Sequence, residues 1–347
     1  MFLFASSCGW LTGPDDEEVD PRTFTWTVDT LAYPGSLQTH MLSIWGSSPN
    51  DVYVVGHNER GYGKMYHFNG NEWSDVGLNP IQGGYIVGPI TLEAIHGVAT
   101  DDIWAVGERR YDNPDPPPNY YDSSLVIHYD GIDWREVETP SGRVLQAIGG
   151  RGPNDLWAGG LNVTLFHYDG TTWEKRSIGD TLQLLSYPQF RSFVSDGNQV
   201  YSLLYKGGGS NTYYVLQLIN GEWRLLDDLS LHTGFLWMSS SGSLYATGPT
   251  LQRREQGHWQ DTFESRPDSV LILRADGIDD DNLFAVGYSQ NHFVGMVYHY
   301  NGTDWYQVPI PQIYPVHLGA VWTDGREVFV QGILSNYPQS TVILHGR

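Results

Sequence analysis

One phrase recurs along this chain: an apolar strand, a tight turn and a tryptophan. It reads FHYDGTTW at 166–173, and close copies are YHFNGNEW at 66–73, IHYDGIDW at 127–134 and YHYNGTDW at 298–305. Asp-Gly or Asn-Gly between two apolar runs is the strongest short-range signal for a β-hairpin. Because such self-similarity indicates a repeat architecture, the chain is restricted to folds assembled from repeated hairpins.

Each repeat also has a first half, in which two strands are joined by a polar turn. Clear copies read SIWGSSPNDVYVVG and AIGGRGPNDLWAGG. Asn and Asp suit these turns because their side chains accept hydrogen bonds from nearby backbone amides. Seven first halves align, at 43–56, 94–107, 147–160, 192–204, 238–248, 274–287 and 320–332. With two strands in each half, every repeat is predicted to form a four-stranded sheet.

The ends of the chain indicate how the last repeat is completed. The second halves carry tryptophan in only six repeats, at Trp73, Trp134, Trp173, Trp223, Trp259 and Trp305. The seventh repeat stops after its third strand at 341–347, whereas TFTWTV at 23–28 precedes the first repeat and carries Trp26 in the matching place. We expect this N-terminal strand to complete the last sheet, because ring closure removes exposed sheet edges. The prediction is an all-β, seven-bladed β-propeller over residues 23–347.

Glycine and histidine recur at fixed places in the predicted blades. We expect packing between blades to leave no room for a side chain at the end of the second strand, where the chain has Gly56, Gly107, Gly160, Gly248, Gly287 and Gly332. The third strand carries His67, His128, His167, His299 and His345. Residues repeated round a ring lie far apart, so we interpret these histidines as scaffold and expect neither a shared metal site nor a cofactor.

The charge and the single cysteine limit the classes of partner. The chain has 40 acidic and 19 basic side chains among 347 residues, a net charge of −21. Such a surface repels phosphate backbones, so we expect no nucleic-acid partner; the acidity is also compatible with a role in solubility alone. Cys8 is the only cysteine, which excludes an internal disulfide framework.

Residues 1–22 are predicted to be a membrane tether. The run MFLFASSC places small residues directly before Cys8, as at the end of a bacterial lipoprotein signal peptide, and the acidic segment GWLTGPDDEEVDPR follows. We interpret this as a truncated signal, a lipid-anchor cysteine and a solvated tether. The alternative is an unstructured N-terminus with an incidental cysteine. Elsewhere no run reaches the length of a spanning helix, so Cys8 would provide the only membrane attachment.

The combined pattern IWG…NDVYVVG…HYDG..W resembles the repeats of bacterial seven-bladed β-propeller lipoproteins, and it lacks the WD40, kelch and Asp-box patterns. The resemblance covers residues 23–347. It implies an extracytoplasmic binding scaffold in the bacterial envelope, as an outer-membrane lipoprotein or at the cell surface. We expect a monomer.

Tyrosine-rich loops provide the first set of candidate binding residues. In antiparallel blades, the links between strands two and three share one face with the links between blades. The long insertions fall there, at 57–64, 108–123, 205–213, 288–295 and 334–339. Their tyrosines suit sugar rings or a protein partner, and the candidates are Tyr62, Tyr111, Tyr120, Tyr121, Tyr205, Tyr213, Tyr288 and Tyr337. Alternatively, the rings pack against their own loops.

The first strands of the blades, which line a propeller's channel, provide the second set. At one aligned position three successive blades carry Glu93, Gln146 and Arg191, and the remaining blades carry Leu42, Phe235, Leu273 and Gly319. Two residues earlier stand His40 and His317, in blades that ring closure makes neighbours. Such groups bind polar ligands or perform acid–base chemistry, although a hydrogen-bonded, water-filled channel also needs them.

Three functions remain open from these observations. The first is an envelope-anchored module that recognises a glycan or a protein through the tyrosine-rich face. The alternative is an extracytoplasmic hydrolase or lyase at the channel mouth, with Glu93, Arg191, His40 and His317 as catalytic groups. The third is a structural subunit of a larger assembly, which requires an apolar patch on one face.

Overall fold

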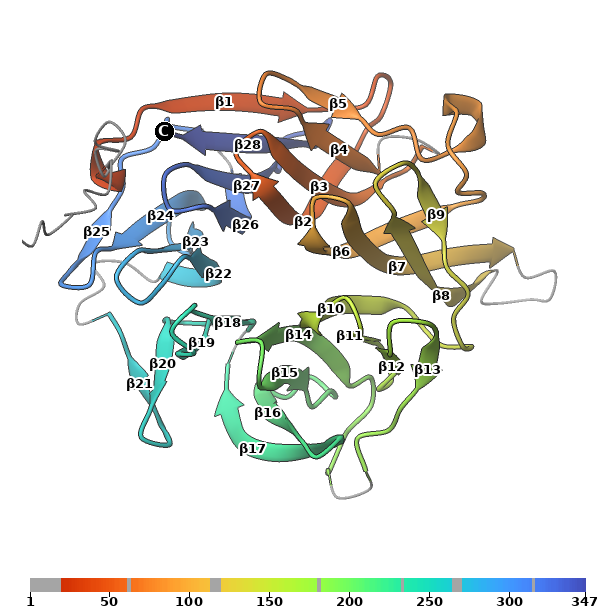
Figure 1. Ribbon diagram of the computed structural model, residues 1–347. Helices are drawn as coiled ribbons and strands as arrows, with labels where there is room; N and C mark the ends of the chain where they lie inside the picture. The colour runs from red at the N-terminus through yellow and green to blue at the C-terminus, as the bar shows by residue number, and fades with distance from the viewer. Residues whose placement is uncertain are drawn as a thin grey trace, which may run out of the picture.

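The computed structural model describes residues 20–60, 64–112, 120–179, 182–231, 234–263, 270–313 and 316–347. In these ranges the strands form seven four-stranded antiparallel sheets around a central axis (Figure 1). The helical segments described are two short 3-10 turns, η1 (Pro21–Thr23) and η2 (Pro80–Gln82). Within the same ranges, helices of the length and apolarity needed to cross a bilayer are absent. The predicted all-β, seven-bladed propeller is confirmed.

In blades 1 to 6 the four strands follow one another in the chain from the axis outward, and in blade 7 the first three do. Blade 1 has β2 (Thr39–Ser48), β3 (Asp51–Asn58), β4 (Met65–Phe68) and β5 (Trp73–Asp75). Blade 2 has β6 (Ile90–Ala99), β7 (Asp102–Asp112), β8 (Tyr120–Tyr129) and β9 (Trp134–Glu136). Blade 3 has β10 (Leu145–Gly152), β11 (Asp155–Gly160), β12 (Leu165–Tyr168) and β13 (Trp173–Lys175). Blade 4 has β14 (Gln189–Ser195), β15 (Val200–Tyr205), β16 (Thr212–Ile219) and β17 (Glu222–Ser230). Blade 5 has β18 (Leu236–Met238), β19 (Leu244–Ala246), β20 (Gln252–Glu255) and β21 (His258–Asp261). Blade 6 has β22 (Val270–Gly277), β23 (Leu283–Ser289), β24 (Val294–Tyr300) and β25 (Trp305–Gln307). Blade 7 has β26 (Val316–Thr323), β27 (Val328–Leu334), β28 (Ser340–Gly346) and, as its outer strand, β1 (Trp26–Leu31).

The N-terminal strand closes the ring, as predicted. Strand β1 pairs antiparallel with β28, from Trp26 opposite Gly346 to Leu31 opposite Thr341, and the two lie side by side in Figure 1. Just before β1, the buried ring of Phe24 stacks on Phe284 of blade 6, with 6.3 Å between ring centroids. The first strand therefore joins the last blade to its neighbour as well as completing it.

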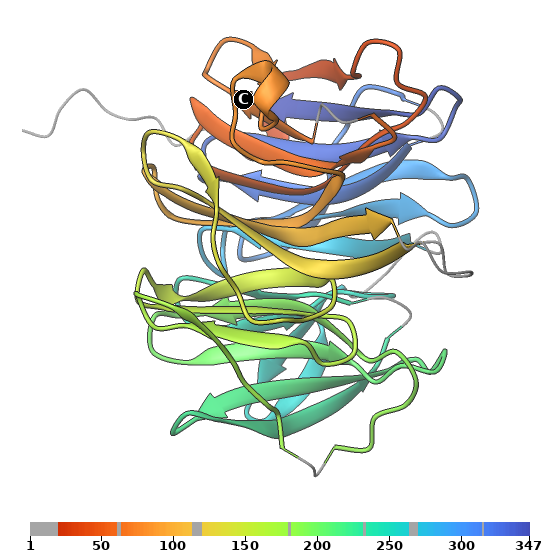
Figure 2. The same ribbon diagram turned by 90° about the vertical axis from the view of Figure 1, so that its right-hand side faces the viewer.

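The hydrophobic core lies between the blades. Seven clusters of buried side chains are found in the described residues, and each contains residues of two neighbouring blades. The cluster that joins blades 7 and 1, for example, contains Phe329 and Phe68, whose ring centroids are 5.5 Å apart. Figure 2 views the ring from its edge and shows the successive sheets packed face to face. Since each blade needs both neighbours to bury its faces, closure of the ring is part of forming the core.

The repeated histidines are part of these interfaces. In blade 1 the ring of His67 stacks on Tyr53 at 4.2 Å, and its Nε2 lies 2.8 Å from the Asp51 carboxylate at the start of β3. Trp134 of the next blade meets Tyr53 edge-on, with 6.1 Å between centroids. The corresponding Nε2 contacts are His128–Asp102 at 2.7 Å, His167–Asp155 at 2.7 Å, His299–Asn282 at 3.1 Å and His345–Glu327 at 2.5 Å. Each histidine thus bonds within its own blade, and in the described ranges metal-ligating residues do not gather in groups of three or more.

Four of the six glycines that end the second strands are required for a different reason from the one predicted. A Cβ at Gly107 would lie 1.9 Å from the carbonyl oxygen of Thr91, in the first strand of the same blade. Gly56, Gly160 and Gly287 would meet the equivalent carbonyl at 1.8 to 1.9 Å. Packing between blades is therefore the wrong explanation at these positions, because the obstacle is the backbone of the blade itself. In each of these blades that backbone lies just before a β-bulge of the first strand.

Candidate functional site

The first strands share a β-bulge at the position that the sequence alignment singled out. In six blades one residue is skipped in the ladder between strands one and two, namely Leu42, Glu93, Gln146, Arg191, Leu273 or Gly319. In blade 5, Phe235 directly precedes β18 and takes the equivalent place. A bulge leaves its extra residue unpaired and re-aims the side chain. Because the first strands are innermost (Figure 1), these residues lie at the channel.

A polar pocket of about 290 Å³ opens between blades 1 and 2 on the long-loop side of the channel. Its lining residues are Gln38, His57, Asn58, Glu59, Thr91, Glu93, Glu108 and Arg110. Burial and the neighbouring Glu108 raise the pKa of Glu93 to about 7, although Arg191 and Arg110 act in the opposite direction. A carboxyl group that titrates near neutral pH is suited to exchanging a proton, or to binding a ligand in its protonated or its ionised form.

The second strand of blade 2 extends this pocket. Residues 108–123 were expected to be a loop, but β7 continues to Asp112 and β8 begins at Tyr120, with Arg109 opposite Ser123. The extension holds Glu108 and Arg110, whose side chains form an ion pair at 2.8 Å. On blade 1, burial lowers the pKa of His57 to about 4. Sequence reasoning missed these groups because the insertion has no clear alternation of apolar and polar residues.

The opposite side of the channel carries two arginines on one aromatic ring. The guanidinium of Arg191 lies 4.7 Å from the centroid of Phe235, and that of Arg274, from blade 6, packs on the same ring. Burial lowers the pKa of both arginines. Arg191 and Glu93 each shift the other's pKa, so the structure brings these two predicted residues into electrostatic contact.

Arg274 was not singled out from the sequence, although a signal for it exists. It follows the bulge residue Leu273. The corresponding residues of the other bulged blades are small, namely Ser43, Ala94, Ala147, Ser192 and Ala320. A long cationic side chain in a series of small ones marks a position with a separate role.

His40 and His317 lie on β2 and β26, the first strands of neighbouring blades, as ring closure predicted. Each ring is engaged by a different partner. His40 packs edge-on against His57 at 5.5 Å, whereas His317 stacks on Tyr288 at 4.4 Å. Burial lowers the pKa of both imidazoles. The two histidines therefore lie on the same side of the molecule, but in separate groups of rings.

The predicted tyrosines divide into packed and exposed groups. Tyr288 is used in the stack on His317, and Tyr205 packs on Tyr213 with 5.2 Å between centroids. Tyr111 and Tyr337 are exposed, the latter by 72%. Tyr62 and Cys8 lie outside the described residues, as do the side chains of Tyr120 and Tyr121. Packing within the loops thus accounts for some of the candidates, whereas Tyr337 keeps most of its side chain exposed.

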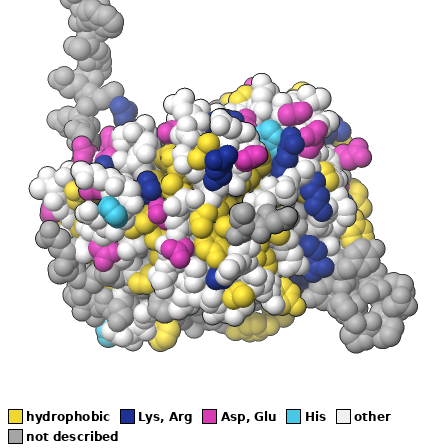
Figure 3. Space-filling view, turned by 90° about the horizontal axis from the view of Figure 1, so that it is seen from below, with side chains coloured by type: hydrophobic (Ala, Val, Ile, Leu, Met, Phe, Trp, Pro, Cys, Tyr) yellow, Lys and Arg dark blue, Asp and Glu magenta, His cyan; other side chains and the backbone are white. Residues whose placement is uncertain are grey.

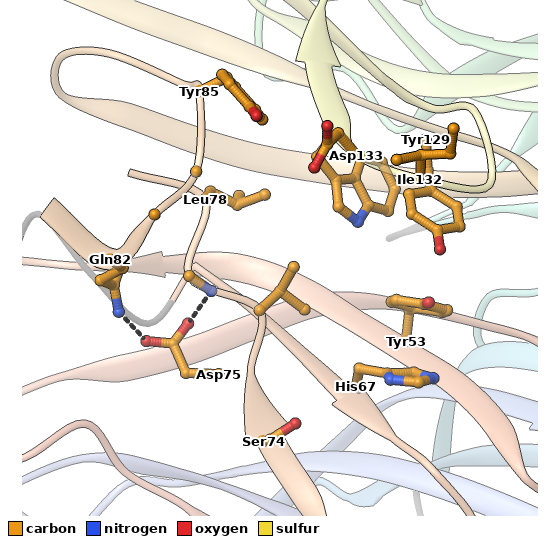
Figure 4. Close-up of a pocket in the computed structure, with 15 residues that line it drawn as sticks. Tyr53, His67, Ser74, Asp75, Leu78, Gln82, Tyr85, Tyr129, Ile132 and Asp133 are labelled. Carbon is orange, nitrogen blue, oxygen red and sulfur yellow. Dashed lines mark hydrogen bonds between the residues drawn. The ribbon is translucent and has the colours of Figure 1, made fainter. Parts of the chain in front are cut away.

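A second pocket, of about 370 Å³, opens at the outer rim between blades 1 and 2 (Figure 4). Asp75 and Asp133 stand on different sides of the opening, with Tyr85 and Tyr129 among the lining rings. Asp75 accepts hydrogen bonds from the backbone of Gly77 at 3.2 Å and from Gln82 Nε2 at 2.7 Å, which hold the linker in place. Carboxylates combined with aromatic faces favour a cationic group, and here that group is the chain's own Arg135, which lies 4.2 Å from the centroid of Tyr85 and 3.0 Å from the Asp133 carboxylate. None of the residues that line this pocket was among the candidate binding residues predicted from the sequence.

The outer edge of the ring has an apolar area of its own. Figure 3, seen from below, shows hydrophobic side chains gathered in the middle of this surface, with acidic and basic side chains around them. Figure 1 places β17 at this edge, where the side chain of Leu225 is half exposed. This is the type of surface that a subunit of a larger assembly would use.

The fold and the channel define a seven-bladed β-propeller with a polar channel mouth. Neither a protein-family model nor a curated protein sequence matches the chain. The solved structure of YCF48 bound to D1 peptide is similar, with a TM-score of 0.61 and 13% identity over 94% of this chain and 97% of that one. A chain of the mitotic checkpoint complex has a TM-score of 0.57 and 13% identity, covering 98% of each chain. The Cps50 (Swd1) β-propeller domain of Myceliophteria thermophila has a TM-score of 0.57 and 8% identity, covering 91% of this chain and 99% of that one. At these identities the likeness shows the fold alone.

Proposed function

We propose that this chain is a binding module whose long-loop face recognises a macromolecular partner, a protein or a glycan, around the channel mouth. The observation that carries the proposal is the pocket at Glu93, where groups of two blades leave an open polar cavity on that face. Exposed tyrosines on the same face supply the flat contact surfaces that such recognition uses. A peptide or protein partner is favoured, because two of the similar solved structures are a peptide complex and a multiprotein complex.

Attachment to the bacterial envelope through a lipid on Cys8 is part of the same proposal. It is supported by the apolar run and small residues before Cys8 and by the acidic segment that follows. A tethered propeller would present its loop face to extracytoplasmic partners. Mass spectrometry of the protein purified from its native membrane tests this part, because an acylated Cys8 peptide is expected and an unmodified one would contradict it.

The loop face can be tested with peptide and glycan arrays. We expect Tyr337→Ala and Tyr111→Ala to weaken binding about tenfold or more, as is common for exposed aromatic contacts. Tyr306→Ala is the matched control, since Tyr306 is 38% exposed and Tyr111 39%, but Tyr306 lies on the outer strand β25. Binding that only Tyr306→Ala weakens, or no binding to either array, would reject the loop face as the recognition surface.

A second candidate function is catalysis by a hydrolase or lyase at the channel mouth. The observation that favours it is the pKa of Glu93, about 7, which allows this carboxyl group to act as an acid or a base near neutrality. In this reading Arg191 stabilises negative charge near Glu93. Assays on peptide and polysaccharide substrates test it, with turnover expected to disappear in Glu93→Gln. Turnover that survives this substitution would exclude Glu93 from the chemistry.

The pKa of Glu93 also predicts a pH dependence of stability. Its folded-state pKa is about 7 against an ordinary value of 4.5, so its stabilising contribution is fully present below 4.5 and is lost as the pH rises through 7. As the pH rises from about 5 to 8, ionisation of this group should lower the free energy of unfolding by about 2 to 3 kcal/mol. We expect Glu93→Gln to remove that decline in chemical denaturation, and the exposed Glu174→Gln to retain it. Identical pH profiles for all three proteins would contradict the shift.

A further inference from the structure

Two guanidinium groups in the channel share one aromatic ring. Arg191 comes from the bulge of β14, Arg274 follows the bulge of β22, and both pack on Phe235 of blade 5. Their side-chain hydrogen bonds go to neutral oxygens. Arg191 Nη1 donates to the amide oxygen of Gln189 at 3.4 Å, and Arg274 Nη1 donates to the carbonyl of Leu273 at 3.1 Å. Among the described residues, neither guanidinium forms an ion pair with a carboxylate.

Other polar atoms beside this pair are also left without partners. The Nε of Arg191 is buried and has no hydrogen-bond acceptor among the described residues. The Oε1 of Gln146, the bulge residue of blade 3, is buried and has no donor in the same part of the chain. Buried polar atoms in folded proteins are nearly always paired. One donor and one acceptor therefore face the channel at adjacent bulges, where a ligand can use both.

The charge balance points to an anion. Arginine stays protonated in proteins, so the two guanidiniums keep their positive charges even though burial and mutual repulsion oppose this. Both side chains are half-buried at the channel, and a charge that is partly withdrawn from water without a counter-charge is unfavourable. Glu93 can carry at most one negative charge, so it offsets the two positive charges only in part. Positive charge thus remains uncompensated at this place, in a chain whose net charge is −21.

We propose that the channel binds a carboxylate group between Arg191 and Arg274, and that Gln146 accepts a hydrogen bond from an N–H or O–H group of the same ligand. The planar forks of guanidinium groups suit the two oxygens of a carboxylate. The chemistry is shared by free amino or hydroxy acids and by the C-terminus of a peptide. The proposed carboxylate site lies in the channel, and the proposal does not depend on which partner the loop face recognises.

Thermal unfolding of the full chain tests the proposal, at one pH and one ionic strength, with four probes. The probes are sodium acetate, triglycine with a free C-terminus, triglycine amide and inorganic phosphate. We expect acetate or triglycine to raise the unfolding midpoint and the amide to leave it unchanged. Acetate acting as strongly as triglycine would assign the site to small free carboxylates, and triglycine acting more strongly would assign it to peptide C-termini. An equal effect of the amide, a larger effect of phosphate, or no effect of any probe would overturn the proposal.

Variants locate the effect. We expect Arg191→Leu and Arg274→Leu to weaken binding of the carboxylate about tenfold or more, because each removes a charged hydrogen-bond donor. Without ligand, Arg274→Leu should unfold at a higher temperature than the native chain, since it removes an uncompensated, half-buried charge. Arg224→Leu is the control, because Arg224 is exposed on β17 and paired with Glu222. If the midpoint shift persists in both channel variants, or is lost in Arg224→Leu as well, the carboxylate does not bind where we place it.

Discussion

A chain that begins at Tyr33, without η1 and β1, is expected to lose the cooperative unfolding transition of this protein. Its last blade would expose the whole edge of β28, which β1 covers in a six-residue ladder. It would also lose the buried side chains of Phe24 and Leu31. Removing one large core side chain costs about 2 to 5 kcal/mol, and a whole domain is stable by about 5 to 15 kcal/mol. The combined loss is therefore comparable with the total stability.

The matched control for this deletion is a chain that begins at Asp20, which retains η1 and β1. Near-ultraviolet circular dichroism during urea unfolding compares the two proteins through their many interface tryptophans. We expect a normal transition for the control and a shallow or absent one for the deletion. A synthetic peptide of residues 20–35 should restore part of the transition when added in trans. Equal midpoints for the two chains would show that the ring does not need its N-terminal strand.

The second large effect is expected from Gly107→Ala, which should destabilise the protein by about 3 kcal/mol or more. The new Cβ would lie 1.9 Å from the Thr91 carbonyl oxygen and 3.0 Å from the Cα of Leu92. Neither atom can move without disturbing the bulge at Glu93. Because Thr91 and Glu93 line the channel-mouth pocket, the folded fraction should also bind its ligand less well.

Gly319→Ala is the control for this substitution. Gly319 is itself the bulge residue of blade 7, but its Cβ would meet its nearest neighbour, Gln331 Oε1, at 3.5 Å, an ordinary contact. We expect a change within about 1 kcal/mol, with a small gain possible from the lower entropy of the unfolded chain. Urea denaturation of both variants measures the difference. Equal losses at the two glycines would mean that substitution of any channel-side glycine is harmful and that the carbonyl contact is not the cause.

Much of the fold was predictable because it is encoded over short distances. Asn-Gly and Asp-Gly turns specify hairpins locally, and alternating apolar residues specify which face of each strand is buried. The orphan strand at Trp26 showed how the ring closes, since the seventh repeat lacks its own outer strand. The same repetition identified the bulge position, although the bulge itself was not foreseen. The role of Gly107 was misassigned for that reason, because only a displaced backbone explains the close carbonyl.

The candidate site was predictable only in part. Alignment brought Glu93, Gln146 and Arg191 to one position of the first strands, and the structure places all three at bulges of successive blades. The contribution of Arg274 depends on its contact with Phe235, which belongs to a different blade and lies 39 positions earlier in the sequence. The rim pocket of Figure 4 likewise joins the linker after β5 to the hairpin of the next blade.

The sequence by itself determined the number of blades, the order of their strands, the closing role of the N-terminal strand and the aligned channel position. These features follow from turn chemistry and apolar periodicity, which act between residues close in the chain. Only the tertiary structure decided that Arg191 and Arg274 meet on Phe235, that Glu93 lies in a pocket with Glu108, and that His40 and His317 have different ring partners. These contacts depend on how neighbouring blades pack and on the direction in which each bulge turns its side chain. No repeat pattern specifies either, because the residues concerned are the ones in which the repeats differ.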